Sequence, residues 1–252
     1  MNTTKQVTFG KVPEVTLIFW IMKILATTLG ETGGDAVSMS MNLGYLVSTG
    51  IFGILFVIMV TVQISSKKFR PIIYWTTILA TTTIGTTMAD FADRSLHIGY
   101  AGGTTVLCTL LMLSLFVWHR VLGSIAVNTV SSPKSEMFYW ITIMFSQTLG
   151  TALGDWTADT AGMGYVRGAM IFGAMLLIIA LAYYRTKISR TGLFWAAFIL
   201  TRPLGAVAGD FLDKPLSNGG LELSRYTASA AILVLILMFI FFFSHKAARK
   251  AH

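Results

Sequence analysis

The feature that most constrains this chain is a short sequence frame that occurs four times. In each copy a glycine follows a tryptophan by ten residues, and an aspartate follows that glycine by five. The frames are Trp20, Gly30, Asp35; Trp75, Gly85, Asp90; Trp140, Gly150, Asp155; and Trp195, Gly205, Asp210. Such self-similarity indicates an architecture assembled from one recurring supersecondary unit.

Each copy contains two apolar stretches of about 20 residues, the length that crosses a bilayer. The chain of 252 residues is 54% hydrophobic and only 12% charged, about half the charged share of a soluble domain. We predict an all-α polytopic membrane protein with one transmembrane domain, residues 1–252, and repeats at about 13–66, 69–121, 134–186 and 189–245. Its eight transmembrane helices are predicted at about 14–32, 43–65, 71–89, 99–120, 137–154, 164–184, 191–209 and 226–244.

Two spans in every copy mean that all four copies enter the membrane in the same direction. They are therefore parallel repeats about an axis along the membrane normal, with pseudo-twofold symmetry that approaches fourfold. Small residues four positions apart, such as Gly30 with Gly34, let helix backbones approach closely. We expect the odd-numbered helices to pack together as an inner layer and the more uniformly apolar even-numbered helices to face lipid.

Charged residues separate sharply between the two sides of the predicted membrane. The side of the termini has thirteen basic residues: Lys5, Lys11, Lys67, Lys68, Arg70, Arg120, Lys134, Arg185, Lys187, Arg190, Lys246, Arg249 and Lys250. It has two acidic residues, whereas the other side has nine acidic and four basic ones. Basic loops stay in the cytoplasm, so we expect both termini to be cytoplasmic. The net charge of +8 is then a topology signal, and we expect no nucleic-acid partner.

The chain resembles a family of bacterial membrane proteins built from four tandem repeats and catalogued as a domain of unknown function ("uncharacterised membrane-anchored protein"). Repeats of that family each carry two transmembrane segments and a tryptophan, as Trp20, Trp75, Trp140 and Trp195 do here. The resemblance covers nearly the whole chain and implies eight spans in a bacterial cytoplasmic (inner) membrane. It implies no reaction and no catalytic residues. The fourth repeat departs from the pattern, with Gly220 where the other copies have tyrosine.

The tryptophans of the frame begin the odd-numbered helices and are interpreted as anchors at the lipid headgroups. The aspartates admit two interpretations. They cap or terminate helices, or they gather around the axis as a vestibule that attracts cations. The second interpretation predicts a metal or cation site, whose candidate residues are Asp35, Asp90, Asp155, Asp210, Asp93, Asp159 and Asp213.

A polar stripe follows the third, seventh and eleventh positions after each tryptophan, which lie on one helix face. It places Lys23 and Arg202 near mid-membrane, where charges usually face an interior or a wet cavity. Glu31 is too far from Lys23 to pair within its helix, but it could pair with Arg202. The candidate substrate-binding residues are Lys23, Thr27, Glu31, Thr82, Gln147 and Arg202. A purely structural network of buried ion pairs is the alternative.

These patterns favour a small secondary transporter or exporter, most of all of a cation, with a polar path between the odd-numbered helices. Because Lys23 and Arg202 are both basic and lie near mid-membrane, an anionic or zwitterionic solute is an alternative substrate. A non-transporting scaffold or sensor subunit is a further alternative. The sequence has no P-loop, HExxH or GxSxG motif and no haem-ligand pair, so we expect no enzyme activity and no cofactor. The expected partners are the lipid bilayer and a small ion or solute, and a homo-oligomer is an open alternative.

Overall fold

The computed structural model describes residues 10–248, and within that range it contains eight α-helices. They are α1 (Leu17–Asp35), α2 (Gly44–Ser65), α3 (Pro71–Asp90), α4 (Tyr100–Leu122), α5 (Pro133–Asp155), α6 (Gly164–Arg185), α7 (Arg190–Asp213) and α8 (Arg225–Phe242). Short π-helical turns follow α1, α3 and α5, at Ala36–Ser40, Phe91–Ser95 and Trp156–Thr160, and 3₁₀ turns lie at Val127–Thr129 and Leu216–Asn218. The eight helices predicted from the repeat are confirmed, with ends shifted by a few residues.

Local sequence signals explain where the inner helices begin. Thr16 accepts a hydrogen bond from the backbone of Phe19, and Ser132 forms a reciprocal capping box with Ser135. Pro71 and Pro133 occupy first turns, where the missing N–H costs nothing. The chain therefore marks the helix starts at the end of the bundle where the termini lie.

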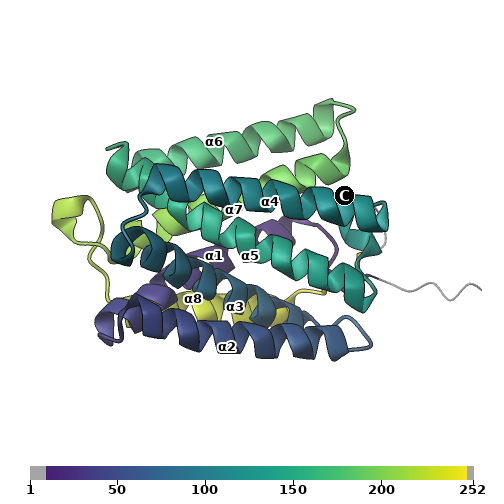
Figure 1. Ribbon diagram of the computed structural model, residues 1–252, viewed down its shortest axis with the longest axis horizontal. Coiled ribbons are helices and arrows are strands. Elements are labelled where there is room, and N and C mark those ends of the chain that lie inside the picture. The colour runs from purple at the N-terminus through teal and green to yellow at the C-terminus, as the bar shows by residue number, and fades with distance from the viewer. Residues whose placement is uncertain (1–9, 249–252) are drawn as a thin grey trace, which may run out of the picture.

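The odd-numbered helices form a closed inner ring, in which α1 packs against α3, α3 against α5, α5 against α7 and α7 against α1. Each even-numbered helix then packs on the inner helix of the following repeat. Thus α2 covers α3, α4 covers α5, α6 covers α7, and α8 returns to cover α1 (Figure 1). The last helix of the chain therefore completes the same arrangement around the first, as the parallel repeats predict.

Aromatic residues form a closed belt at the end of the ring where α1 begins. Each inner helix carries a Phe–Trp or Tyr–Trp pair, and the first ring of each pair packs against the tryptophan of the next repeat. Centroids are 5.6 Å apart for Phe19 and Trp75, 5.7 Å for Tyr74 and Trp140, 6.1 Å for Tyr139 and Trp195, and 5.7 Å for Phe194 and Trp20. The last pair joins repeat four to repeat one, so the belt has pseudo-fourfold symmetry.

This belt contradicts the interpretation of the tryptophans as headgroup anchors. Trp75, Trp140 and Trp195 are at most 3% exposed, and only Trp20 is partly exposed. A ring buried inside the protein cannot lie among lipid headgroups. The repeated tryptophans instead hold neighbouring inner helices together, because large aromatic side chains contribute much of the packing energy of a core.

The glycines of the frame lie at the closest approaches between inner helices. A Cβ atom at Gly30, Gly85, Gly150 or Gly205 would collide with Thr82, Gln147, Arg202 or Thr27, respectively. In each case the colliding residue is the seventh after the tryptophan of the next repeat. The small-residue faces therefore pack the inner layer, as expected.

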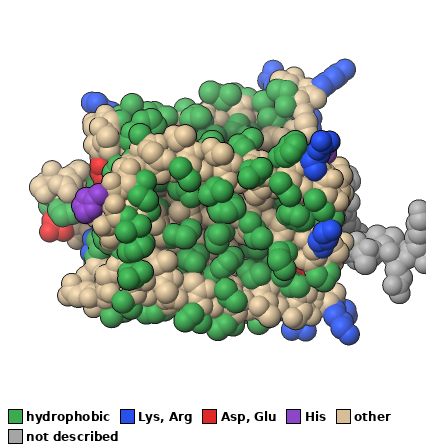
Figure 2. Space-filling view, in the orientation of Figure 1, with side chains coloured by type: hydrophobic (Ala, Val, Ile, Leu, Met, Phe, Trp, Pro, Cys, Tyr) green, Lys and Arg blue, Asp and Glu red, His purple; other side chains and the backbone are tan. Residues whose placement is uncertain are grey.

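The outer surface of the helix bundle is apolar. Figure 2 shows hydrophobic side chains over the visible face, with most visible Lys and Arg side chains at one end and acidic ones at the other. Among the described residues, five helices are long and apolar enough to cross a membrane, namely α2, α4, α6, α7 and α8. The other inner helices, α1, α3 and α5, carry more polar residues because their polar side chains face the ring interior. Lys5, Arg249 and Lys250, which the charge count assigns to the terminal side, lie outside the described residues.

Candidate functional site

Arg202 reaches the centre of the inner ring. From α7 its guanidinium donates hydrogen bonds to Glu31 of α1 (2.9 Å), Thr151 of α5 (2.6 Å) and Thr86 of α3. One side chain thus joins all four inner helices, and it is completely buried. The eleventh residue after the fourth tryptophan is Ala206, whereas the other copies have glutamate or threonine there.

The ion pair between Arg202 and Glu31, predicted from the sequence, is confirmed at 2.9 Å. Thr27 lies beside it, since its backbone carbonyl accepts a 3.5 Å hydrogen bond from Arg202. Its hydroxyl donates to backbone carbonyls, including that of Thr201 in α7. Thr82 is equally buried, but its hydroxyl has no hydrogen-bond partner among the described residues. The structure therefore brings these polar-stripe residues together inside the ring.

Lys23 is the exception to this pairing. It is completely buried, and no carboxylate in residues 10–248 forms an ion pair with it. Its ammonium group donates one long hydrogen bond, 3.5 Å, to the side-chain oxygen of Gln147 and lies 4.2 Å from the centre of the Phe198 ring. The side-chain nitrogen of Gln147 has no partner in the described part of the chain. A buried cation without a counter-charge is costly. Lys23 is therefore either a neutral amine or a cation that can bind an anionic group inside the ring.

The four aspartates of the frame gather at the other end of the ring, and basic residues bridge them in pairs. The ammonium of Lys214 lies 2.6 Å from Asp35 and 3.1 Å from Asp210. The guanidinium of Arg94 lies 2.8 Å from Asp90 and 3.4 Å from Asp155. Each bridge joins the aspartate of one repeat to that of the next. The acidic layer is therefore pseudo-twofold, whereas the aromatic belt is pseudo-fourfold.

The aspartates do not cap helices through their side chains, although α1, α3 and α5 each end at one of them. Asp35, Asp90 and Asp155 each precede a π-helical turn, yet none of their side chains makes a capping hydrogen bond. Asp210 lies inside α7, which continues to Asp213. Their carboxylates make ion pairs instead.

The second acidic residues, which repeats two, three and four carry after the frame aspartate, do not form a common ring. Asp213 is buried and pairs with Arg225 at 2.8 Å, and Arg225 also approaches Asp35 at 3.9 Å. Asp93 is half-buried, and Asp159 is exposed. Of these three acids, the structure places only Asp213 with the buried carboxylates.

Three buried carboxylates from two inner helices come together beside Arg202. One oxygen each of Glu31, Asp35 and Asp210 lies within 4.8 Å of the others, a spacing at which three ligands can hold a cation. Lys214 already places its ammonium between two of them. Burial lowers the pKa of Lys214, but Asp210 and Asp35 outweigh it and hold that pKa well above its usual value. This lysine is therefore a tethered cation at the acidic cluster.

Sequence reasoning missed the roles of Lys214, Arg94 and Arg225. A signal for the first two was present, because each stands four residues after the frame aspartate, in repeats four and two. That spacing places the basic side chain on the same face as the aspartate, one helical turn further on. Repeats one and three have Met39 and Asp159 at this position, which is the pseudo-twofold pattern of the bridges.

The ring is closed at the end that carries the aromatic belt. The chain before α1 runs across this end, where the backbone N–H of Lys11 donates to Val130 and that of Ala248 donates to Val12, both at 2.8 Å. The ammonium of Lys11 lies 2.6 Å from Glu136 at the start of α5. At the opposite end, the bridging Arg94 and Arg225 are partly exposed. The polar interior thus lies behind a sealed end on one side and a layer of ion pairs on the other.

Comparison with known proteins gave one match. A family model described as a repeat of unknown function (DUF347) matches residues 18–69, 73–123, 138–189 and 193–249. These four stretches coincide with the four two-helix units of the structure. No curated protein and no solved structure matched the chain.

Proposed function

The chain belongs to the DUF347 repeat family, and we propose that it is a small secondary transporter whose substrate passes along the axis of the inner ring. The proposal places eight spans in a bacterial cytoplasmic membrane, with both termini in the cytoplasm. The apolar outer helices and the basic residues at the terminal end support this placement. The aromatic belt then closes the cytoplasmic end, and the aspartate layer faces outward.

The main support for a cation as the substrate is the cluster of Glu31, Asp35 and Asp210. It supplies only carboxylate oxygens, which suit hard cations such as Mg²⁺, Ca²⁺ or Mn²⁺. Lys214 holds this place in the closed state and neutralises the acids. A substrate cation would take its place when Lys214 and the loop that follows it move outward.

Glu31 is the proposed coupling residue, since it belongs both to the cation cluster and to the ion pair with Arg202. A proton on Glu31 removes its negative charge, weakens its hold on Arg202 and withdraws one cation ligand. Cation release and movement of the guanidinium away from the axis would then follow from the same proton.

The test is flux in proteoliposomes that contain a pH-sensitive dye and a dye for the cation. We expect wild-type protein to exchange protons for at least one of Mg²⁺, Ca²⁺ and Mn²⁺, and Glu31→Gln to abolish the exchange. Glu14→Gln, in the segment before α1 at the opposite end of the ring, is the matched control and should be unaffected. Unchanged flux in Glu31→Gln would remove this residue from the mechanism. Absence of flux for every solute tested would favour the scaffold or sensor.

Lys23 favours a second candidate, the carriage of a small anionic or zwitterionic solute. Its ammonium group and the unpartnered amide nitrogen of Gln147 are both hydrogen-bond donors. Arg202 adds a second positive charge within the same ring. A solute carboxylate would supply the counter-charge that this layer lacks, and an attached amino group could meet the carboxylates of the outer cluster. Counter-flow of radiolabelled amino acids distinguishes this candidate from cation exchange.

A further inference from the structure

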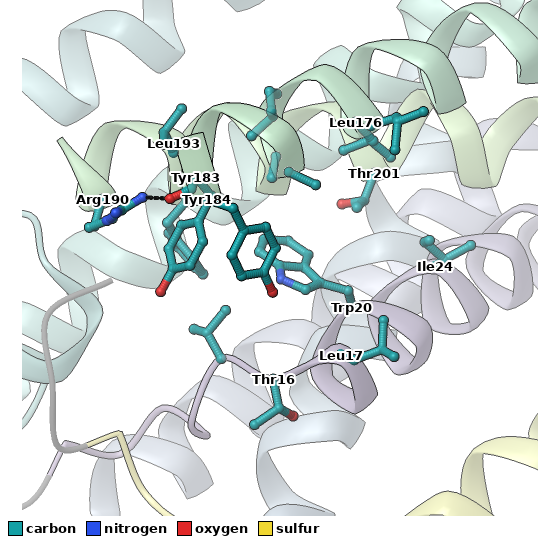
Figure 3. Close-up of a pocket in the computed structure, with 16 residues that line it drawn as sticks. Thr16, Leu17, Trp20, Ile24, Leu176, Tyr183, Tyr184, Arg190, Leu193 and Thr201 are labelled. Carbon is teal, nitrogen blue, oxygen red and sulfur yellow. Dashed lines mark hydrogen bonds between the residues drawn. The ribbon is translucent and has the colours of Figure 1, made fainter. Parts of the chain in front are cut away.

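A groove lies outside the ring interior, between α1, α6 and α7. Its volume is about 550 Å³, within the size range of sites for small molecules. The walls are mostly aliphatic, from Leu17 and Ile24 of α1 to Leu176 and Leu193 on the facing helices. Figure 3 shows Trp20 and the two tyrosines of α6 projecting into this space.

The groove exists because one tryptophan of the aromatic belt is left uncovered. The indole N–H of Trp195 donates a 3.0 Å hydrogen bond to Ile125, in the long loop that precedes α5. The corresponding cover for Trp20 would be the loop that precedes α7. That loop, residues 186–189, is shorter than the 123–132 loop, and Trp20 lines an open groove.

The groove opens sideways, toward the lipid of the proposed membrane. Leu17, Leu177 and Tyr184 on its rim are 75%, 61% and 80% exposed. Along α7 it extends from Arg190 to Thr201, about 16 Å at about 1.5 Å per residue. Half of a hydrocarbon core of about 30 Å is about 15 Å, so the groove spans one leaflet. It therefore fits one acyl chain that runs parallel to the helices.

A cationic group lies at the end of the groove nearest the termini. The guanidinium of Arg190 stacks on Tyr183 at 4.2 Å and donates a hydrogen bond to its backbone carbonyl. Guanidinium has five N–H donors, and their planar geometry matches a phosphate group. Arg185 and Lys187 are close by in sequence, so the local potential favours anionic headgroups.

We propose that this groove is a specific site for one anionic phospholipid of the leaflet on the side of the termini. One acyl chain lies between α1 and α6 against Trp20, and the phosphate lies at Arg190. The bound chain fills the gap that the short loop before α7 leaves and completes the packing around the belt. This inference rests on the membrane placement proposed above and not on the transport mechanism.

The experiment is native mass spectrometry of the full chain, delipidated in detergent and titrated with phosphatidylglycerol or phosphatidylcholine of the same acyl composition. We expect one phosphatidylglycerol to bind at least tenfold more tightly than phosphatidylcholine. Arg190→Gln should remove that preference, and Ala180→Phe, which fills the groove from an exposed position, should weaken both lipids.

Two matched controls, Arg167→Gln and Ala174→Phe, change α6 residues that do not line the groove and should bind like the wild type. Equal binding of the two lipids by wild-type protein would overturn the proposal, as would unchanged binding in Ala180→Phe. Membrane placement fails separately, because a chain that needs no detergent for extraction from cells would contradict it whatever the lipid titration shows.

Discussion

The two halves of the inner ring share a backbone frame and differ in charge. The α3–α5 half carries hydrophobic or neutral polar side chains along its stripe: Ile78, Thr82, Thr86, Ile143, Gln147 and Thr151. The α1–α7 half carries Lys23, Glu31 and Arg202 at corresponding positions. The aromatic belt and the glycine contacts are alike in both halves, whereas the charged residues of the polar stripe belong to one half. The repeat thus builds the scaffold, and the departures from it mark the candidate site.

The sharpest test of this asymmetry is Arg202→Met. It leaves Glu31 buried without its ion-pair partner, so we expect a loss of about 3–5 kcal/mol in the free energy of unfolding. Thr82→Val, at the corresponding position of α3, should change stability little, because that hydroxyl has no hydrogen-bond partner among the described residues. Denaturant titration of both variants in detergent measures the difference. Adding Glu31→Gln to Arg202→Met should recover part of the lost stability. No recovery would contradict the explanation that the loss comes from the buried, unpaired Glu31.

The bridging residues of the two halves provide the next comparison. Lys214→Met should leave the three-carboxylate cluster in need of a cation, and the variant should be stabilised by Mg²⁺, Ca²⁺ or Mn²⁺. At a concentration 100 times the dissociation constant, the expected gain is about 2.7 kcal/mol. Arg94→Met is the matched control in the other half, where no glutamate joins the aspartates, and it should respond less. Equal responses of the two variants would argue against a cation site at Glu31.

The ion pairs of Lys214 also predict how the stability of the fold depends on pH. Since its pKa in the folded protein is held above the ordinary value, its ion pairs stabilise the fold fully below that ordinary value. The contribution is lost only as the pH rises through the folded pKa. The stability advantage of wild type over Lys214→Met, measured without divalent cations, should therefore not decrease between about pH 7 and pH 9.

Lys23→Met separates stability from function. Replacing a buried, unpaired ammonium by an apolar side chain should stabilise the fold by about 2 kcal/mol, within the range seen when buried charged groups give way to hydrophobic ones. Binding of an anionic or zwitterionic solute should be lost at the same time. Ile78→Met, at the corresponding position of α3, should alter neither property much. A destabilised Lys23→Met protein would show that the lysine is satisfied in the native ring.

The smallest expected changes in stability are at the frame glycines, which both halves of the ring share. Gly85→Ala and Gly205→Ala each force a Cβ into the next inner helix, so each should cost about 1–2 kcal/mol by overpacking. Gly33→Ala, whose Cβ would have no neighbour within 4 Å, should be neutral or slightly stabilising. Thermal unfolding in detergent compares the three. A large difference between Gly85→Ala and Gly205→Ala would mean that the scaffold is less symmetric than its frame.

Much of the candidate site could be predicted from the sequence, because residue spacing within each repeat shows which residues share a helix face. Residues spaced by three or four share a face, so the polar stripe was predictable from the sequence. The pairing of Glu31 with Arg202 was predictable for the same reason, since opposite charges on facing helices attract each other strongly away from water. The bridges of Lys214 and Arg94 were not recognised, because both residues were assigned to loops beyond the spans. In the structure Arg94 lies in a π-helical turn, and Lys214 directly follows the extended α7.

The sequence by itself determined the eight helices, their grouping in four units and the positions where the pattern breaks, because spacing and hydropathy are local properties of the chain. Only the tertiary structure decided which helix covers each face. It turned the tryptophans inward, since each packs against an aromatic ring of another repeat. It also placed basic residues between the clustered aspartates and left Trp20 uncovered. Contacts between repeats decided all of these, because no single repeat contains both partners.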